Sequence, residues 1–176
     1  AADLLAQAEH DTDAAAILVS SSRSLIDRTN SKLVSQLADL PTAATARAAL
    51  ANGFAVLTGS NSESAEIADR LAPEHLQIIT EDASALAASI RHAGAIFIGA
   101  YTAEVFGDYG LGPNHTLPTG GTARSFAGLS VFDFLRIRTT IELSESPRAD
   151  VVDSIARLAR LEGLEAHARA AEIRRR

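Results

Sequence analysis

Residues 72–99, APEHLQIITEDASALAASIRHAGAIFIG, contain two short apolar runs separated by a helical pattern. The runs are His75 to Thr80 and Ala93 to Gly99, and Ala83 to His92 between them has apolar residues three and four positions apart. Short aliphatic runs predict buried strands, and the three-four spacing predicts a helix. The order strand, helix, strand predicts a right-handed βαβ unit with parallel strands.

The same alternation extends toward the N-terminus. Apolar runs at Ala14 to Ser20 and Phe54 to Thr58 alternate with helical patterns at Arg23 to Leu40 and Ser62 to Leu71. We therefore predict an α/β fold with a parallel sheet and flanking helices, in a chain that already shows a helical pattern at Ala1.

Cap and turn residues predict the ends of these helices. We expect Asn61 or Ser62 to cap the helix that follows, because an amide or hydroxyl oxygen accepts from free N–H groups at a helix start. We expect Gly53, Gly94 and Gly163 to end helices in the left-handed conformation that glycine adopts without strain.

The pattern changes after residue 100. Long polar loops at the carboxyl end of a parallel strand often bind ligands, which makes residues 101–128 a candidate site. Beyond this loop we predict a strand at Thr139 to Leu143 and helices at Pro147 to Leu161 and Leu164 to Arg176. We divide the chain into an α/β domain, 1–128, and a C-terminal helical segment, 129–176. The glycines of the loop are Gly107, Gly110, Gly112, Gly120, Gly121 and Gly128.

The composition excludes several classes of protein. The 176 residues carry a formal net charge of −6, which disfavours binding to nucleic acid phosphates, and the basic run Arg174 to Arg176 is explained as helix-end charge. The chain has no cysteine, so disulfides, thiolate metal sites and cysteine nucleophiles are excluded. Without a stretch of about 20 apolar residues or a signal-peptide pattern, we expect no membrane partner and a soluble, cytoplasmic protein.

Two pairs of residues in the α/β part suggest acid–base or metal chemistry. Gln7 and His10 are three apart, which on a helix puts both side chains on one face as two metal ligands. Glu74 and His75 lie at the junction of a helix and a strand and form an acid–base pair suited to neutral pH. The alternatives are an exposed polar helix end for the first pair and a solvated turn histidine for the second.

The glycine-rich loop and the last helix add further candidates. Asp108 and His115 place a carboxylate and an imidazole in the loop, and Glu162 and His167 flank the start of the last helix. The alternatives are a turn cap for Asp108 and a solvated helix residue for His167. A site built from His, Asp and Gln without thiolates suits zinc or a neighbouring divalent metal.

Six stretches, in order along nearly the whole chain, resemble the C-terminal part of the histidinol dehydrogenase family: AQAEHD, RLAPEHL, AGAIFIGAYT, GDYGLGPNHTLPTGGTAR, GLSVFDFL and EGLEAHARA. The resemblance implies a partial Rossmann-like domain. It also implies a zinc enzyme of histidine biosynthesis that oxidises L-histidinol to L-histidine through an aldehyde, with NAD accepting two hydrides.

The resemblance also implies roles for individual residues, carried over by position. Glu74 and His75 match the acid–base pair of the family. The remaining roles are zinc ligation by Gln7, His10, Asp108 and His167, and substrate binding by His75, Asp108, His115, Glu162 and His167.

Further expectations follow from the share of the family that the chain covers. The family sequence is more than twice as long, and its NAD contacts lie in the part that this chain does not match, so we expect a C-terminal fragment that is inactive alone. Family members are intertwined homodimers, in which Glu162 and His167 would act in the partner's site. The alternatives are a non-catalytic zinc-binding or scaffold relative, a dehydrogenase of another small alcohol, and a zinc hydrolase using Glu74 and His75.

Overall fold

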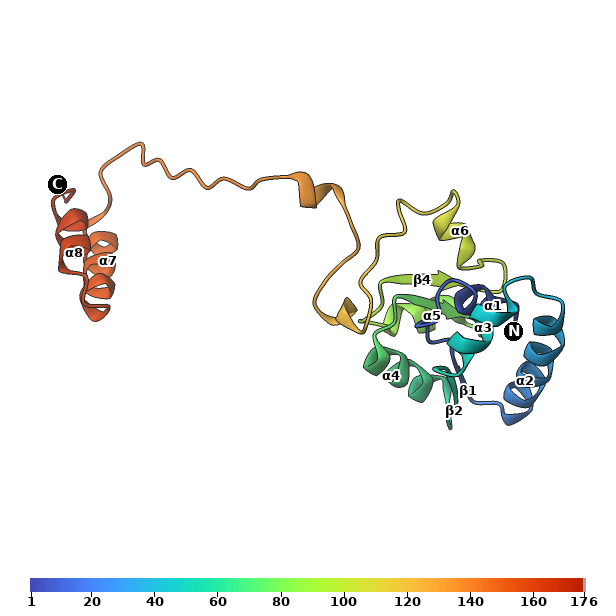
Figure 1. Cartoon of the computed structure of the whole chain (residues 1–176). Helices are drawn as coiled ribbons and strands as arrows, with labels where there is room; N and C mark the ends of the chain where they lie inside the picture. The colour runs from blue at the N-terminus through green and yellow to red at the C-terminus, as the bar shows by residue number, and fades with distance from the viewer. Residues whose placement is uncertain (176) are drawn as a thin grey trace. The chain divides into compact units, whose positions relative to one another are not determined.

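In a computed structural model that describes residues 1–175, the chain forms two compact units, Ala1–Phe134 and Leu135–Arg176. Arg176, the end of the predicted basic run, lies outside the described residues. The first unit contains the strands, and the described part of the second contains helices and irregular segments (Figure 1). Among residues 1–175, no helix combines the length and apolar character needed to cross a bilayer.

The first unit contains four short strands in two parallel pairs. Strand β1 (Ile17–Ser20) pairs with β2 (Phe54–Leu57), and β3 (His75–Ile78) pairs with β4 (Ala95–Ile98). The α/β class and the parallel pairing are confirmed. The strands form two separate two-stranded sheets rather than one continuous sheet.

Across the described part of the chain, six α-helices lie in the first unit and two in the second. The predicted helices include α2 (Arg23–Ala38), α4 (Asn61–Leu71) and α5 (Ala83–Ser89), as well as the two helices of the second unit, whereas α3 (Ala43–Leu50) was missed. The others are α1 (Ala2–Ala8), α6 (Val105–Asp108), α7 (Ala149–Leu161) and α8 (Glu165–Glu172), with 3₁₀ turns at Thr122–Arg124 and Val131–Phe134.

The core of the first unit holds α1 in place. Leu5 and Ala8 on α1 pack with Ala46 and Ala49 of α3, and three of these, the alanines, are fully buried. Alanine has no side chain beyond Cβ, so the two helices approach closely. This contact fixes the direction in which the opposite face of α1, including Gln7, points.

Two predicted glycine caps are wrong, and the structure gives a different reason for both residues. Neither Gly53 nor Gly94 has a positive φ. A Cβ on Gly53 would collide with the carbonyl oxygen of Ala16, and one on Gly94 would lie 2.6 Å from that of Glu74. These positions need glycine because a neighbouring backbone passes too close for any side chain. Gly163 does take φ 77° after α7, as predicted.

Two other local predictions also differ. Ser60, rather than Asn61 or Ser62, caps α4, and its Oγ accepts from the backbone N–H of Glu63 at 3.1 Å. The strand predicted at 139–143 is wrong, because these residues form no ladder and Ile141 is 85% exposed. A short apolar run needs a neighbouring strand to pair with, and its unit contains only helices and irregular segments among the described residues.

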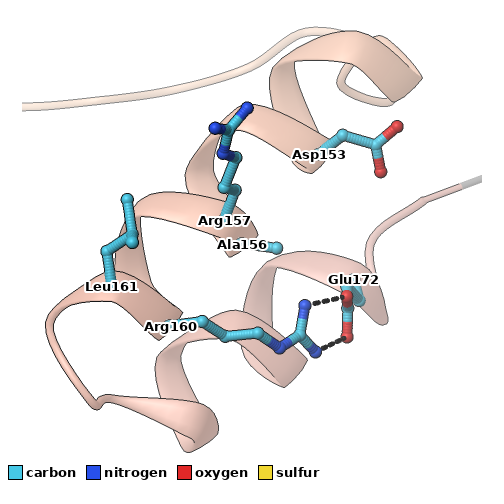
Figure 2. A pocket seen from close by; sticks show the side chains of 6 residues that line it. All are labelled: Asp153, Ala156, Arg157, Arg160, Leu161 and Glu172. Atoms are coloured by element: carbon cyan, nitrogen blue, oxygen red, sulfur yellow. Dashed lines mark hydrogen bonds and ion pairs between the residues drawn. The ribbon is translucent and has the colours of Figure 1, made fainter.

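The second unit is a helical hairpin. Helices α7 and α8 pack through Ala156, Ala159 and Ala168, and Arg160 on α7 pairs with Glu165 and Glu172 on α8 at 2.9 and 2.8 Å. Figure 2 shows Arg160 reaching across to Glu172 beside a shallow pocket. Hydrogen bonds from Arg160 lower the pKa of both glutamates, so this network joins the two helices at neutral pH.

Candidate metal and acid–base site

His75 is held at the first position of β3. The N–H groups of Gly94 and Ala95 donate to the carbonyls of Pro73 and Glu74 at 2.9 and 2.8 Å, which fixes the backbone that leads into the strand. The imidazole packs against the ring of Phe97 with 5.9 Å between centroids and 52° between planes. The side chain therefore rests on β4 with a defined orientation.

Helix α6 turns back along β4 and lies on the same phenylalanine. A Cβ on Gly107 would lie 2.9 Å from Cε1 of Phe97, so only glycine lets α6 approach this closely. Glu104, at the N-cap, and Asp108, the last residue of α6, are four positions apart. Phe97 is thus the shared support of His75 and of the helix that carries both carboxylates.

These elements bring three potential metal ligands together. Ligand atoms of His75, Glu104 and Asp108 all lie within 4.8 Å of one another. Nδ1 of His75 lies 3.6 Å from Oε1 of Glu104, and the two side chains are only 14% and 15% exposed. The cluster is a partly buried group of nitrogen and oxygen donors.

Gln7 joins this cluster from α1. Its Oε1 lies 3.0 Å from Nδ1 of His75. His10 follows two residues after the end of α1, so the predicted pair does not share one helix face. The charge of His10 nevertheless acts on Glu104, which puts His10 within electrostatic reach of the same cluster.

The electrostatics of the cluster centre on Glu104. Burial raises the pKa of its carboxyl above the ordinary value. The positive charges of His75 and His10 oppose this shift in pKa, whereas Asp108 and Glu74 add to it. A bound cation would offset the repulsion among these carboxylates.

The cluster lies at a different edge of the sheet from the one expected. Parallel sheets usually bind ligands beyond the carboxyl ends of their strands. Here the loop leaves the carboxyl end of β4 at Gly99, but α6 returns to His75, the first residue of β3. The reason is the contact between Gly107 and Phe97, which draws α6 back over the strand.

Glu104 is a site residue that sequence reasoning missed. The available signal is its position four residues before Asp108, which puts the pair on one face only if the segment is helical. The short sequence Val105–Asp108, with a glycine inside it, gave no helical pattern.

Other predicted residues lie outside this cluster. His115 is exposed on its loop, where the neighbouring Asn114 side chain donates to the carbonyl of Leu129 at 2.7 Å. Glu162 ends α7 and His167 lies on α8, both exposed in the second unit. A further pocket in the first unit is lined by residues of the loop after His115, including Leu117, Phe126 and Asp133.

The donor set fits a borderline divalent metal. Imidazole nitrogen, carboxylate oxygen and amide oxygen are available without any thiolate, and zinc accepts such ligands. Among residues 1–175, this is the one group of three or more His, Asp or Glu side chains with ligand atoms close enough to share an ion.

Comparison with known proteins gives a consistent result. Residues 1–175 match the family model described as histidinol dehydrogenase. The chain is 49% identical over 175 residues to histidinol dehydrogenase from Geobacillus kaustophilus, covering 99% of this chain and 41% of the relative. It is 50% identical over 175 residues to that from Nitratidesulfovibrio vulgaris, covering 99% of this chain and 40% of the relative.

A solved structure is also similar. The crystal structure of histidinol dehydrogenase from Elizabethkingia anophelis matches with a TM-score of 0.92 and 33% identity, over 98% of this chain and 40% of that chain. The chain therefore spans about 40% of the length of the curated relatives that it matches.

Proposed function

The chain belongs to the histidinol dehydrogenase family, and from this we propose that it supplies the metal and acid–base part of an enzyme that oxidises L-histidinol to L-histidine through L-histidinal. The observation that carries the proposal is the partly buried cluster of His75, Glu104 and Asp108, with Gln7 against the same imidazole. Such a group of proton acceptors and metal-ligand atoms suits the oxidation of an alcohol, which releases protons.

We assign zinc to the ligands Gln7, His10, Asp108 and His167. When bound, zinc would hold and polarise the amino alcohol, and NAD would accept the two hydrides. Asp108 belongs to the cluster, Gln7 contacts its imidazole, and His10 lies within electrostatic reach of Glu104. His167 belongs to the second unit, and its part in the site is carried over from the family.

His75 and Glu74 form the acid–base pair of the proposed reaction. In the first oxidation, His75 accepts the hydroxyl proton of the alcohol as a hydride leaves its carbon, which gives the aldehyde. Glu74 then takes a proton from a water that attacks the aldehyde carbon, and His75 returns its proton to the aldehyde oxygen, which gives the hydrate. His75 accepts the hydroxyl proton of the resulting hydrate as the second hydride leaves, and the product is the carboxylic acid.

The remaining assignments concern substrate binding and assembly. We assign substrate contacts to His115, Glu162 and His167, in addition to His75 and Asp108. We further propose that the C-terminal helical segment, 129–176, forms a homodimer and brings Glu162 and His167 to the partner's site. The cytoplasmic location expected from the sequence also stays a prediction.

The 176-residue chain is not proposed to act alone. The NAD contacts of the family are assigned to a region that the chain does not match, so the cofactor would bind in the remainder of a complete enzyme. We expect the chain by itself to bind zinc and substrate without turnover.

The reaction is tested by measuring NADH formation from L-histidinol by a complete enzyme that carries this sequence. We expect about two NADH per histidinol and loss of activity with a metal chelator, restored by zinc. Turnover of another small alcohol in preference to histidinol would instead support a different dehydrogenase. Zinc and histidinol binding without NADH would support a scaffold relative, and chelator-sensitive hydrolysis would support a zinc hydrolase.

A further inference from the structure

Glu104 has no role in the proposed reaction, yet its environment is unusual for a carboxylate. Its side chain is only 15% exposed, and its Oε1 lies 3.6 Å from Nδ1 of His75. Carboxylates are rarely buried unless they pair with a donor or a cation. The structure therefore suggests a specific task for this side chain beside the imidazole.

The neighbours of Nδ1 decide which imidazole nitrogen carries the proton. The amide oxygen of Gln7 lies at 3.0 Å and the carboxylate of Glu104 at 3.6 Å, and both are acceptors. With acceptors on this side, the tautomer that satisfies the contact is the one in which Nδ1 carries the proton and donates. Nε2 then holds the lone pair, and it is buried without a hydrogen-bond partner among residues 1–175. In this tautomer Nε2 is the atom that accepts a proton.

The hydrogen bond from Nδ1 to Gln7 conflicts with the second task of Gln7. In the proposed function, the same amide oxygen is a zinc ligand. An oxygen that gives electron density to a divalent cation is a weaker acceptor, so the bond that orients His75 would weaken when the metal binds. The imidazole then needs another acceptor on its Nδ1 side. Among the described residues, Glu104 is the other acceptor that pairs with Nδ1, whereas the nearby carboxylate of Asp108 is assigned to the metal.

We propose that Glu104 is a positioning residue for His75. When the metal engages Gln7, the carboxylate of Glu104 accepts the hydrogen bond from Nδ1–H of His75, which keeps Nε2 of His75 free as the base. The proposal rests on the proposed function for the step in which Gln7 binds metal. At 3.6 Å the contact is longer than a hydrogen bond, so the proposal requires the carboxylate to move closer to Nδ1 when the metal binds. Carboxylate partners of this kind fix the tautomer and orientation of functional histidines in other sites.

The first test needs no metal, because Gln7→Ala removes the same acceptor that the metal would engage. Long-range ¹H–¹⁵N correlation spectra of the full 176-residue chain report the tautomer of His75. They are recorded at about pH 8.5, roughly two units above the ordinary histidine pKa of about 6.5. The variants are Gln7→Ala, Glu104→Ala and both together, with exposed Glu81→Gln as a matched control.

The expected result is that each single variant keeps the Nδ1–H tautomer, because one acceptor remains. The double variant should populate both tautomers. Glu104→Gln combined with Gln7→Ala should restore the Nδ1–H form, since the glutamine oxygen also accepts. Mixed tautomers already in Gln7→Ala, or an unchanged double variant, would overturn the proposal.

A second test uses a complete enzyme that carries this sequence. Glu104→Ala should lower kcat by about 10–100-fold, the range seen for residues that orient a ligand or base, with zinc content unchanged and KM changed less. Glu104→Gln should recover part of kcat. Loss of zinc from both variants would make Glu104 a ligand and refute the positioning role. Absence of any histidinol turnover would refute the proposed function, while the tautomer experiment would still decide the role of Glu104.

Discussion

The amide oxygen of Gln7 lies 3.0 Å from Nδ1 of His75, although 68 residues separate the two in sequence. This contact joins the first helix of the chain to the first residue of β3. It links a proposed zinc ligand directly to the proposed base.

Removing a proposed ligand should weaken metal binding. Asp108→Asn and His10→Ala each remove one donor from a small set of ligands. We expect the zinc affinity of a complete enzyme to fall by more than about 100-fold, which exceeds the loss typical when a residue that only hydrogen-bonds to a ligand is removed. Zinc per chain, measured by mass spectrometry after dialysis, reports the effect. Exposed Asp39→Asn is the matched control, and unchanged zinc in either ligand variant would reject that assignment.

Removing the proposed base should slow the reaction without loss of metal. His75→Asn in a complete enzyme eliminates the Nε2 acceptor, and we expect hydride transfer to slow by roughly 10²–10⁴-fold. Zinc content should stay the same, because His75 is not among the proposed ligands. His92→Asn is the control, since the bond of His92 to Asp69 uses its backbone N–H. Full activity of the His75 variant would exclude it as the base.

Adding a side chain where α6 contacts β4 should disturb the position of the carboxylate that α6 carries. A Cβ at position 107 meets the Phe97 ring at 2.9 Å, so Gly107→Ala should push α6 outward and cost about 1–3 kcal/mol of stability. Zinc affinity should fall as well, because Asp108 moves with α6. Gly59→Ala is the control, since its nearest neighbour is the flexible end of Glu63 at 3.3 Å. Equal zinc affinity in both variants would show that α6 adapts without moving Asp108.

A carboxylate outside the site should govern part of the acid stability. Burial raises the pKa of Asp69, but hydrogen bonds from the backbone N–H groups of Arg91 and His92 and from the Arg91 side chain outweigh this effect. The net shift of the pKa is downward from 3.8. A lowered folded-state pKa gives stability that is present above the unfolded value near 3.8 and lost as pH falls through the folded value.

Asp69→Ala tests this relationship. The two N–H groups lose their acceptor, so we expect a loss of about 1–3 kcal/mol near neutral pH, measured by urea unfolding. The difference from the unchanged protein should shrink as pH falls below 3.8. Asp27→Ala is the control, because Asp27 forms an exposed pair with Arg23. A constant difference across this pH range would show that the charge of Asp69 does not contribute.

Much of the fold could be predicted because its signals are local. The apolar runs at residues 54–58 and 75–80 gave β2 and β3, and the helical spacing gave α2, α4 and α5. Helix α3 was missed because its alanine-rich sequence has little contrast between faces. The strand predicted at 139–143 is wrong because an apolar run forms a strand only beside another strand, and the run itself does not show whether a partner is present.

The candidate site was predictable as a set of residue types but not as a geometry. Sequence alone determined the α/β alternation, the family, and a donor set of imidazole, carboxylate and amide groups without thiols. The reason is that periodicity and side-chain chemistry are properties of short segments. Only the tertiary structure decided that Gln7 contacts His75 and that Glu104 joins them. These contacts depend on the packing of α1 on α3 and of Gly107 on Phe97, which no local pattern encodes.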